Sequence, residues 1–383
     1  MSEAAVTEHP AQQSPARASS SSSRTPAILL LAHGTPDTLG QMAEYLHRVT
    51  GGRPMPPAVV EELQHRYAEI GLQETAGDEP PPLTRWTLLQ AHLLEAALER
   101  TQLAGTRVYT GMRNWHPLIA DTVAEMRQNG ITHVQAICLA PQNSRTSVGL
   151  YRRALLEASV GLEVEFVAGW ADNPSLVAAF ADRLWPAWAE ACARTGRRVP
   201  VLFTAHSVPC RTIRSGNAEA GRPGTPVPAN GIQSYDSNGS PDAYPVECKH
   251  TAALIADRLR VVGMRDADWF FAFQSQGVAG APWIGPSVED TLKALAQEGH
   301  TSVVLQPVGF LCDHVEILYD IDIAFRETAR ELGMTLTRAQ SLNDSPLLIQ
   351  ALVEVATGEY QAQVHDQTPA VGASMTAGSA IGV

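Results

Sequence analysis

Three carboxylates, Asp313, Glu316 and Asp320, recur at intervals of three and four residues. This spacing places them on one face of a helix, which we predict over residues 313–331, directly after a buried strand at 301–305. Carboxylates so close together repel one another unless water or a cation screens them. Asp313 stands where a helix cap is expected, and we interpret it as a cap. Glu316 and Asp320 lie one turn deeper, where capping does not explain them.

His206 follows a second apolar strand, at residues 201–205. Open α/β sheets bind ligands at the carboxyl ends of their strands, so His206 could converge there with Glu316 and Asp320. An imidazole and a carboxylate together can accept a proton or hold a divalent metal with open coordination positions. His314 lies nearby in the sequence, but its helical phase points away from Glu316. That phase predicts packing or support rather than ligation.

The elements that carry these side chains occur twice along the chain. Both copies have an apolar strand that ends in Ala-His, and later a strand that ends at a proline; the paired segments are 27–36 with 201–209 and 130–141 with 299–307. Further strands are predicted at 107–111, 162–169 and 268–274, between helical patterns at 117–128, 175–194, 248–262 and 288–298. Strands that alternate with helices indicate βαβ units and parallel sheets. The predicted fold is therefore α/β, with two similar doubly wound, Rossmann-like domains facing across a cleft.

Composition places the limits of these domains. Residues 1–24 are rich in Ser, Ala and Pro and predict a disordered tail. An N-terminal α/β domain is expected at 25–172, a C-terminal α/β domain carrying the metal site at 173–357, and a second tail at 358–383. Residues 215–242, dense in Gly, Pro, Asn and Ser, are too long for an ordinary connection. We interpret them as a flexible insertion, with a functional lid as the alternative.

Charge and cysteine content exclude several classes of protein. The 383 residues carry a formal net charge of -12, which argues against nucleic acid or an anionic membrane surface as a partner. The five cysteines are dispersed and form no CxxC pair, so neither a disulfide framework nor a zinc module nor an iron–sulfur cluster is predicted. No segment has the apolar length of a membrane span. We expect a cytoplasmic monomer.

Short motifs spread over about residues 27–355 resemble the ferrochelatase family in their order along the chain. In the first half these are His33-Gly34-Thr35-Pro36, Arg66-Tyr67, Gln90-Ala91-His92 and Leu139-Ala140-Pro141. In the second half they are Thr204 to Pro209, Gln274-Ser275-Gln276-Gly277, Pro282-Trp283-Ile284-Gly285-Pro286 and Pro307 to Asp320. The resemblance implies a chelatase-like fold and the insertion of ferrous iron, Fe(2+), into a free-base porphyrin during haem biosynthesis.

The resemblance also implies roles for single residues. His206 and Glu316 become the facing pair that binds iron and accepts the pyrrole protons, with Asp320 on the metal or proton path. Trp283 would pack against the ring, and Arg53, Ser144 and Tyr151 are candidates for the propionates. His33 stands where the family commonly has Tyr, and could ligate iron from the other face of the ring or form a hydrogen bond. Ala324 replaces a carboxylate that often continues the acidic helix, which puts an outer metal relay in doubt.

Within the family, the chain resembles the soluble enzymes that act on coproporphyrin III more than the membrane-associated enzymes that act on protoporphyrin IX, because its sequence has no apolar segment of the kind that forms a membrane-facing lip in the latter. The resemblance therefore implies coproporphyrin III as the substrate. Three alternatives remain: protoporphyrin IX as the substrate, another tetrapyrrole metal chelatase, and a carrier that binds haem or metal without catalysis. The pairing of His206 with Glu316 distinguishes the enzyme from the carrier, since a carrier does not require it.

Overall fold

The computed structural model describes residues 26–213, 242–276 and 282–360. The predicted tail at 1–24, all of the predicted insertion except Asp242, and residues 361–383 of the second tail lie outside these ranges.

In the described residues the strands form two four-stranded sheets, and all pairings are parallel. The first sheet has the order β2-β1-β3-β4, with β1 at Pro26–Ala32, β2 at Arg107–Met112, β3 at His133–Cys138 and β4 at Glu163–Val167. The second has the order β6-β5-β7-β8, with β5 at Val201–His206, β6 at Trp269–Gln274, β7 at Ser302–Pro307 and β8 at Thr335–Arg338. The two orders correspond strand for strand. The predicted duplication and fold class are therefore confirmed.

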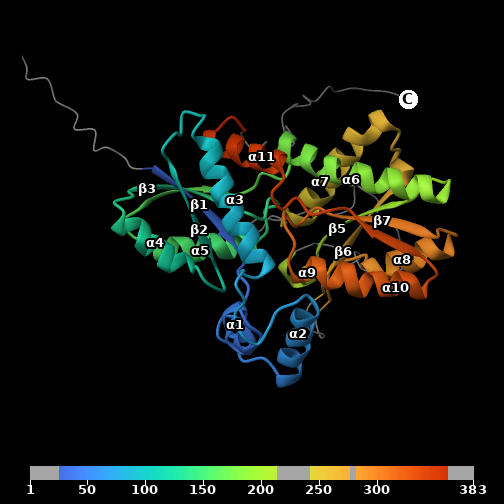
Figure 1. Ribbon diagram of the computed structural model, residues 1–383, viewed down its shortest axis with the longest axis horizontal. Helices are drawn as coiled ribbons and strands as arrows, with labels where there is room; N and C mark the ends of the chain where they lie inside the picture. The colour runs from blue at the N-terminus through green and yellow to red at the C-terminus, as the bar shows by residue number, and fades with distance from the viewer. Residues whose placement is uncertain (1–25, 214–241, 277–281, 361–383) are drawn as a thin grey trace, which may run out of the picture.

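Helices cover both faces of each sheet (Figure 1). The helices of the first half are α1 at Met42–Val49, α2 at Pro57–Glu69, α3 at Pro82–Leu98, α4 at Ile119–Gln128 and α5 at Val148–Ala158. Those of the second half are α6 at Pro174–Thr195, α7 at Tyr244–Arg258, α8 at Val288–Gln297, α9 at Val315–Leu318, α10 at Arg326–Glu331 and α11 at Pro346–Thr357. In Figure 1, α6 and α7 lie on one side of the second sheet and α8, α9 and α10 on the other.

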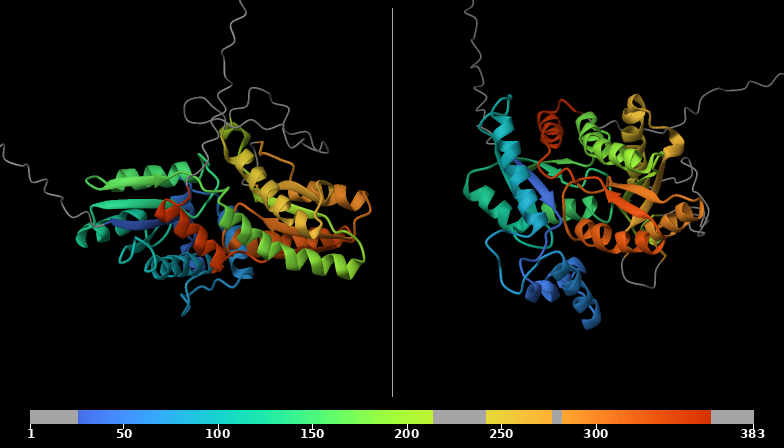
Figure 2. Two further views of the ribbon diagram at one scale, coloured as in Figure 1. Left: turned by 90° about the horizontal axis from the view of Figure 1, so that it is seen from above. Right: turned by 45° about the vertical axis from the view of Figure 1, so that its right-hand side comes forward.

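Successive residues of β1 point into different hydrophobic cores. Ile28 and Leu30 belong to a core that also contains Val201 and Phe203 of β5 together with residues of α3, α6, α7 and α11. Leu29 instead joins a second core, formed with α4 and α5. Side chains alternate between the faces of a strand, and both faces here are apolar, which explains the uninterrupted hydrophobic run. Since one core contains residues of both sheets, the two halves are packed directly together, with α11 between them (Figure 2).

The long helix α6 connects the halves, and local sequence sets both of its ends. The side chain of Asn173 accepts hydrogen bonds from the backbone amides of Ser175 and Leu176, as an N-cap does. Gly196 ends the helix in the left-handed conformation, with φ of 64°, which glycine adopts without a steric penalty.

The acidic segment near the end of the chain differs from the single helix predicted over 313–331. It consists of α9, a π-helical segment at Asp320–Phe325, and α10. The buried apolar side chains are Ile317, Ile321, Phe325 and Ala329, each four residues after the last. In a regular α-helix four residues exceed one turn, so such a row drifts around the axis. The wider π-helical turn offsets this drift and keeps the row on the core.

Candidate active site

His206 and Glu316 meet at the carboxyl edge of the second sheet. His206 is the last residue of β5, and Glu316 lies in α9, which follows the neighbouring strand β7. Because β5 and β7 are parallel, their carboxyl ends open at the same edge. His206 Nε2 lies 3.1 Å from Glu316 Oε1, and each side chain is 32% exposed. The chain thus brings together two residues 110 positions apart, as the sequence predicts.

The orientation of the imidazole is fixed from its other nitrogen. His206 Nδ1 is hydrogen-bonded to the carbonyl oxygen of Ser207, and since a carbonyl only accepts, Nδ1 carries the proton. The hydroxyl of Tyr244 donates to the backbone carbonyl of His206 at 3.0 Å. Nε2 is therefore directed at Glu316 and is the atom available for a proton or a metal.

The two groups shift each other's protonation in opposite directions. Burial alone would lower the pKa of His206, but the charge of Glu316 and its hydrogen bond raise it to about 9. Burial alone would raise the pKa of Glu316, but His206 holds it well below its usual range. At neutral pH the pair is therefore imidazolium and carboxylate, with one proton between them.

The second oxygen of Glu316 faces His314, with 3.4 Å between His314 Nε2 and Glu316 Oε2. His314 Nδ1 is hydrogen-bonded to the carbonyl of Cys312 at 2.9 Å. The expectation that His314 points away from Glu316 is wrong. His314 is the N-cap of α9 and has an extended backbone, with φ of -161° and ψ of -175°, so helical phase does not describe its direction.

Two residues at the end of β6 hold the acidic segment. The side-chain amide of Gln274 donates to the backbone carbonyl of Glu316 at 2.9 Å. The hydroxyl of Thr204 donates to the amide oxygen of Gln274 at 2.6 Å and so orients this amide. The hydroxyl of Ser275 donates to Asp320. Ser275 has φ of 60°, a conformation that is uncommon for residues other than glycine, Asn and Asp. Because such strain persists only where the surroundings impose it, the contact with Asp320 fits a fixed position for this side chain.

Asp320 is 8% exposed and contacts the first half of the chain. Arg66 of α2 approaches Asp320 with 3.6 Å between Nη1 and Oδ1, and its guanidinium lies 5.3 Å from the ring centre of Tyr319. Burial raises the pKa of Asp320 to about 6, and the charge of Glu316 adds to this, against the opposing effects of Ser275 and Arg66. A cation from the first half thus lies beside the carboxylate that follows Glu316 by one turn.

His33 lies just after β1, on the opposite wall. Burial lowers its pKa to about 4, and the charges of Glu316 and His206 act on it as well, so the three groups share one electrostatic environment. The amide of Asn114 lies 3.1 Å from His33 Nε2. The next residue, Gly34, has φ of 90°, and a Cβ there would come within 2.7 Å of the backbone nitrogen of Trp115. Only glycine permits this close approach, which brings Asn114 to His33.

The porphyrin-binding residues predicted beside these are placed differently from one another. Trp283 lies near the pair, with its ring centre 6.5 Å from that of His206. Ser144 is buried and hydrogen-bonded to Thr146, and Tyr151 is a buried residue of the core under α4 and α5. Arg53 is exposed in the connection between α1 and α2 and donates to the carbonyl of Thr50. Burial raises the pKa of Tyr151, and the charge of Glu316 acts on it as well, so Tyr151 shares the electrostatic environment of His33 and the pair.

A cavity of about 250 Å³ borders His314, and apart from His314 and Val315 its lining comes from the first half of the chain. Thr35, Asp37 and Tyr67 contribute from the first half and His314 and Val315 from the second. His314 lines this cavity and also contacts Glu316, so it forms the boundary between the cavity and the pair.

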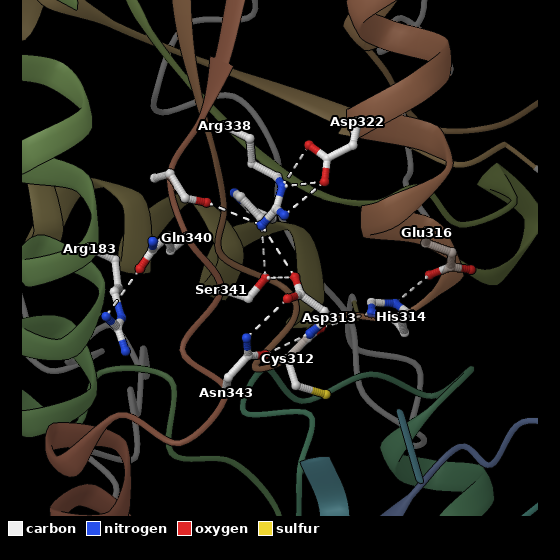
Figure 3. A network of polar contacts seen from close by, with 12 residues as sticks. Arg183, Cys312, Asp313, His314, Glu316, Asp322, Arg338, Gln340, Ser341 and Asn343 are labelled. Carbon is white, nitrogen blue, oxygen red and sulfur yellow. Dashed lines mark hydrogen bonds and ion pairs between the residues drawn. The ribbon is translucent and has the colours of Figure 1, made fainter. Parts of the chain in front are cut away.

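Asp313 does not cap a helix, contrary to the prediction. Its carboxylate accepts hydrogen bonds from Ser341 and Asn343 and faces Arg338, as Figure 3 shows. The helix begins two residues later, at Val315. Arg338, Ser341 and Asn343 were not identified from the sequence, because β8 is short and half-buried and shows no strong strand pattern. The grouping Arg338-Ala339-Gln340-Ser341-Leu342-Asn343 is the one available signal: several polar side chains directly after a strand.

Two general properties of the described residues bear on this site. Within 26–213, 242–276 and 282–360, no three His, Cys, Asp or Glu side chains form a group that could hold a metal ion. Among the helices of the same ranges, none has both the length and the apolar character that crossing a bilayer requires.

Comparisons with known proteins agree with the geometry. The ferrochelatase family model matches residues 25–360. A ferrochelatase from Acidobacterium capsulatum is 55% identical over 331 residues, which cover 86% of this chain and 93% of the relative. Coproporphyrin III ferrochelatases from Geobacillus kaustophilus and Bacillus subtilis are each 31% identical, with 87% and 86% of this chain and 95% and 96% of the relatives covered. The chain belongs to the ferrochelatase family, whose members are porphyrin metal chelatases.

Proposed function

We propose that this chain inserts ferrous iron into coproporphyrin III, with His206 and Glu316 as the groups that receive the metal and the pyrrole protons. The observation that carries the proposal is the pair itself: an imidazole and a carboxylate 3.1 Å apart, each a third exposed, at the edge of the second sheet. A carrier for a finished metalloporphyrin has no need of a paired acid and base.

The reaction replaces two pyrrole N–H protons by one Fe(2+), so two protons must leave the ring as iron loses its bound water. The carboxylate of Glu316 is ionised and can accept a proton or ligate iron. His206 holds a proton at neutral pH and must first pass it to solvent before Nε2 can receive a pyrrole proton or ligate iron. Asp320, one turn beyond Glu316, would take up protons or metal on the outer side of the pair. His33 lies on the other wall, where it would face the opposite side of the ring.

Coproporphyrin III is favoured as the substrate because two of the relatives are named for this porphyrin. Propionates, which protoporphyrin IX carries as well, require cations or N–H donors at the rim. Arg113, half-buried after β2, acts electrostatically on His33 and is a further proposed contact for one of them. Arg53, Ser144 and Tyr151 remain proposed contacts for the outer propionates, and Trp283 a proposed packing surface for the ring.

The test is an anaerobic assay with Fe(2+) and either coproporphyrin III or protoporphyrin IX, in which the absorption change on metallation is followed. His206→Ala and Glu316→Gln should each lower kcat by about 10²- to 10⁴-fold, the usual contribution of a positioned acid or base. His300→Ala is a matched control, since His300 also lies beside a carboxylate, with 3.9 Å between its Nε2 and Glu298 Oε2. It should keep the wild-type rate.

Each outcome separates the alternatives. Wild-type rates in His206→Ala would remove the role assigned to the pair. If only protoporphyrin IX were metallated, the assigned substrate would be wrong, while the assigned reaction, metal insertion into a porphyrin, would stand. Tight porphyrin binding without metallation by the wild-type chain would favour a carrier.

A further inference from the structure

Arg338, the last residue of β8, binds two carboxylates at once. Its Nε and Nη2 donate to Asp322 at 3.0 and 2.8 Å, and its Nη1 lies 3.3 Å from Asp313 Oδ1. The side chain of Arg338 is 12% exposed, and those of Asp313 and Asp322 are 20% and 17% exposed. This is a largely buried network in which one guanidinium joins two separate points of the chain (Figure 3).

Asp313 is held by further partners from the same loop. Ser341 donates to Asp313 Oδ1 at 2.7 Å. The side-chain amide of Asn343 donates to Asp313 Oδ2 at 3.0 Å and accepts from the Asp313 backbone N–H at 2.9 Å. Asn343 has φ of 46°, and its own carbonyl accepts from Gln90 of α3 at 2.7 Å. The position of Asp313 is thus set by the second sheet and also by a helix of the first half.

Asp313 and Asp322 flank, in the sequence, the segment that carries Glu316 and Asp320. Asp313 precedes Glu316 by three residues, and Asp322 follows Asp320 by two. Between them lie the short helix α9 and the start of the π-helical segment. Glu316 thus lies in the first turn of a helical stretch that continues through the π-helical segment into α10. The first turn of a helix has backbone N–H groups without partners inside the helix, so its position depends on contacts with the rest of the protein.

We propose that Arg338 is a positioning residue for metal insertion, which sets the place of Glu316 relative to His206 by fixing both ends of the segment that carries it. Arg338 acts through Asp313 and Asp322, without contact with iron or porphyrin. The inference rests on the function proposed above. A planar guanidinium suits this task because its fork binds Asp322 through two nitrogens while the third reaches Asp313.

The experiment compares Arg338→Gln with Arg326→Gln in the anaerobic assay. Arg326 also pairs with Asp322, at 3.0 Å, but its side chain is 50% exposed and lies on α10. We expect kcat to fall about 10- to 100-fold in Arg338→Gln, the range usual for residues that orient a metal ligand. Arg326→Gln should stay within about threefold of the wild type, as expected for an exposed pair.

A positioning role differs from a general loss of structure in what else changes. The assay is run well below the melting temperature of each variant, with circular dichroism to establish the folded fraction, and porphyrin affinity is measured by fluorescence quenching. Positioning predicts that folded Arg338→Gln binds coproporphyrin III with the wild-type Kd while kcat falls. Asp322→Asn breaks the same ion pair but keeps the Arg338 side chain in its buried place. It should lower kcat in the same way, and it replaces Arg338→Gln if that variant does not fold.

Wild-type kcat in folded Arg338→Gln and Asp322→Asn would overturn the inference, as would a porphyrin Kd that weakens by the same factor as kcat. Failure of the proposed function is read separately, from Glu316→Gln. If Glu316→Gln metallates at the wild-type rate, the pair is not catalytic. If Glu316→Gln is inactive and Arg338→Gln is not impaired, only the positioning role is refuted.

Discussion

Glu247 makes stability depend on pH in a direction that can be worked out. It lies in the first turn of α7, where its Oε2 accepts from the backbone N–H of Asn143 at 2.6 Å. Asn143 follows β3 of the first half, so this hydrogen bond joins the two halves beside Ser144. Burial raises the pKa of Glu247 to about 7, with Asp172 and Asp242 adding to the rise and the Asn143 N–H opposing it.

The size of the effect follows from linkage. The folded chain holds the proton of Glu247 up to pH of about 7, whereas an exposed glutamate loses it near 4.5. The folded state therefore binds more protons than the unfolded state between these values, and the free energy of unfolding falls as pH rises through them. The difference corresponds to about 3 kcal/mol at most. Below pH 4.5 both states are protonated and the effect disappears.

Glu247→Gln removes this titration and keeps an oxygen that can accept from Asn143. We expect equal stability of the variant and the wild type near pH 4.5 and a variant that is more stable by up to about 3 kcal/mol at pH 8. Equilibrium urea unfolding, followed by circular dichroism at both pH values, measures the difference. Glu190→Gln is the control, because Glu190 is exposed and pairs only loosely with Arg194, at 3.8 Å. A difference between Glu247→Gln and the wild type that is the same at both pH values would refute the reasoning.

Two further predictions concern the walls of the site. Ser275→Ala removes the hydroxyl that donates to Asp320. We expect the KM for Fe(2+) to rise about tenfold, as for loss of a hydrogen bond to a charged group, while the KM for porphyrin stays the same. An unchanged KM for Fe(2+) would contradict a metal role for Asp320. His33 is neutral at working pH because burial lowers its pKa to about 4, and the unprotonated ring nitrogen can accept from the Asn114 amide, 3.1 Å from Nε2. Ligation of iron by His33 would replace this hydrogen bond; in that case the absorption spectrum of the bound iron porphyrin should change in His33→Ala, and an identical spectrum would leave His33 with hydrogen bonding alone.

The sequence predicts the fold well because its signals are local. Apolar runs of strand length, separated by helical periodicity, identify seven of the eight strands that the structure describes. β8 is the exception: Thr335–Arg338 is four residues long and half-buried, too short for periodicity to reveal. The repeated Ala-His and strand-to-proline segments predict the duplication, and the identical strand orders of the two sheets bear this out.

The residues of the acidic segment show where local patterns stop being informative. Spacing of three and four residues places Asp313, Glu316 and Asp320 on one helical face only if the helix is regular and includes all three. In the structure Asp313 precedes the helix and a π-helical turn follows Tyr319, so their directions differ from the pattern. The backbone of His314 is extended for the same reason, and its ring meets Glu316.

By itself, the sequence determined the α/β class, the duplication and the family, because each depends on residue types within short segments. It also predicted that His206 and Glu316 could meet, because parallel strands end at the same edge of a sheet. Only the tertiary structure decided what each acidic side chain contacts. Asp320 meets Arg66 from 254 residues away, and Asp313 and Asp322 share Arg338. Such ion pairs join segments whose separate sequences carry no mark of one another, so they arise only when the chain is packed.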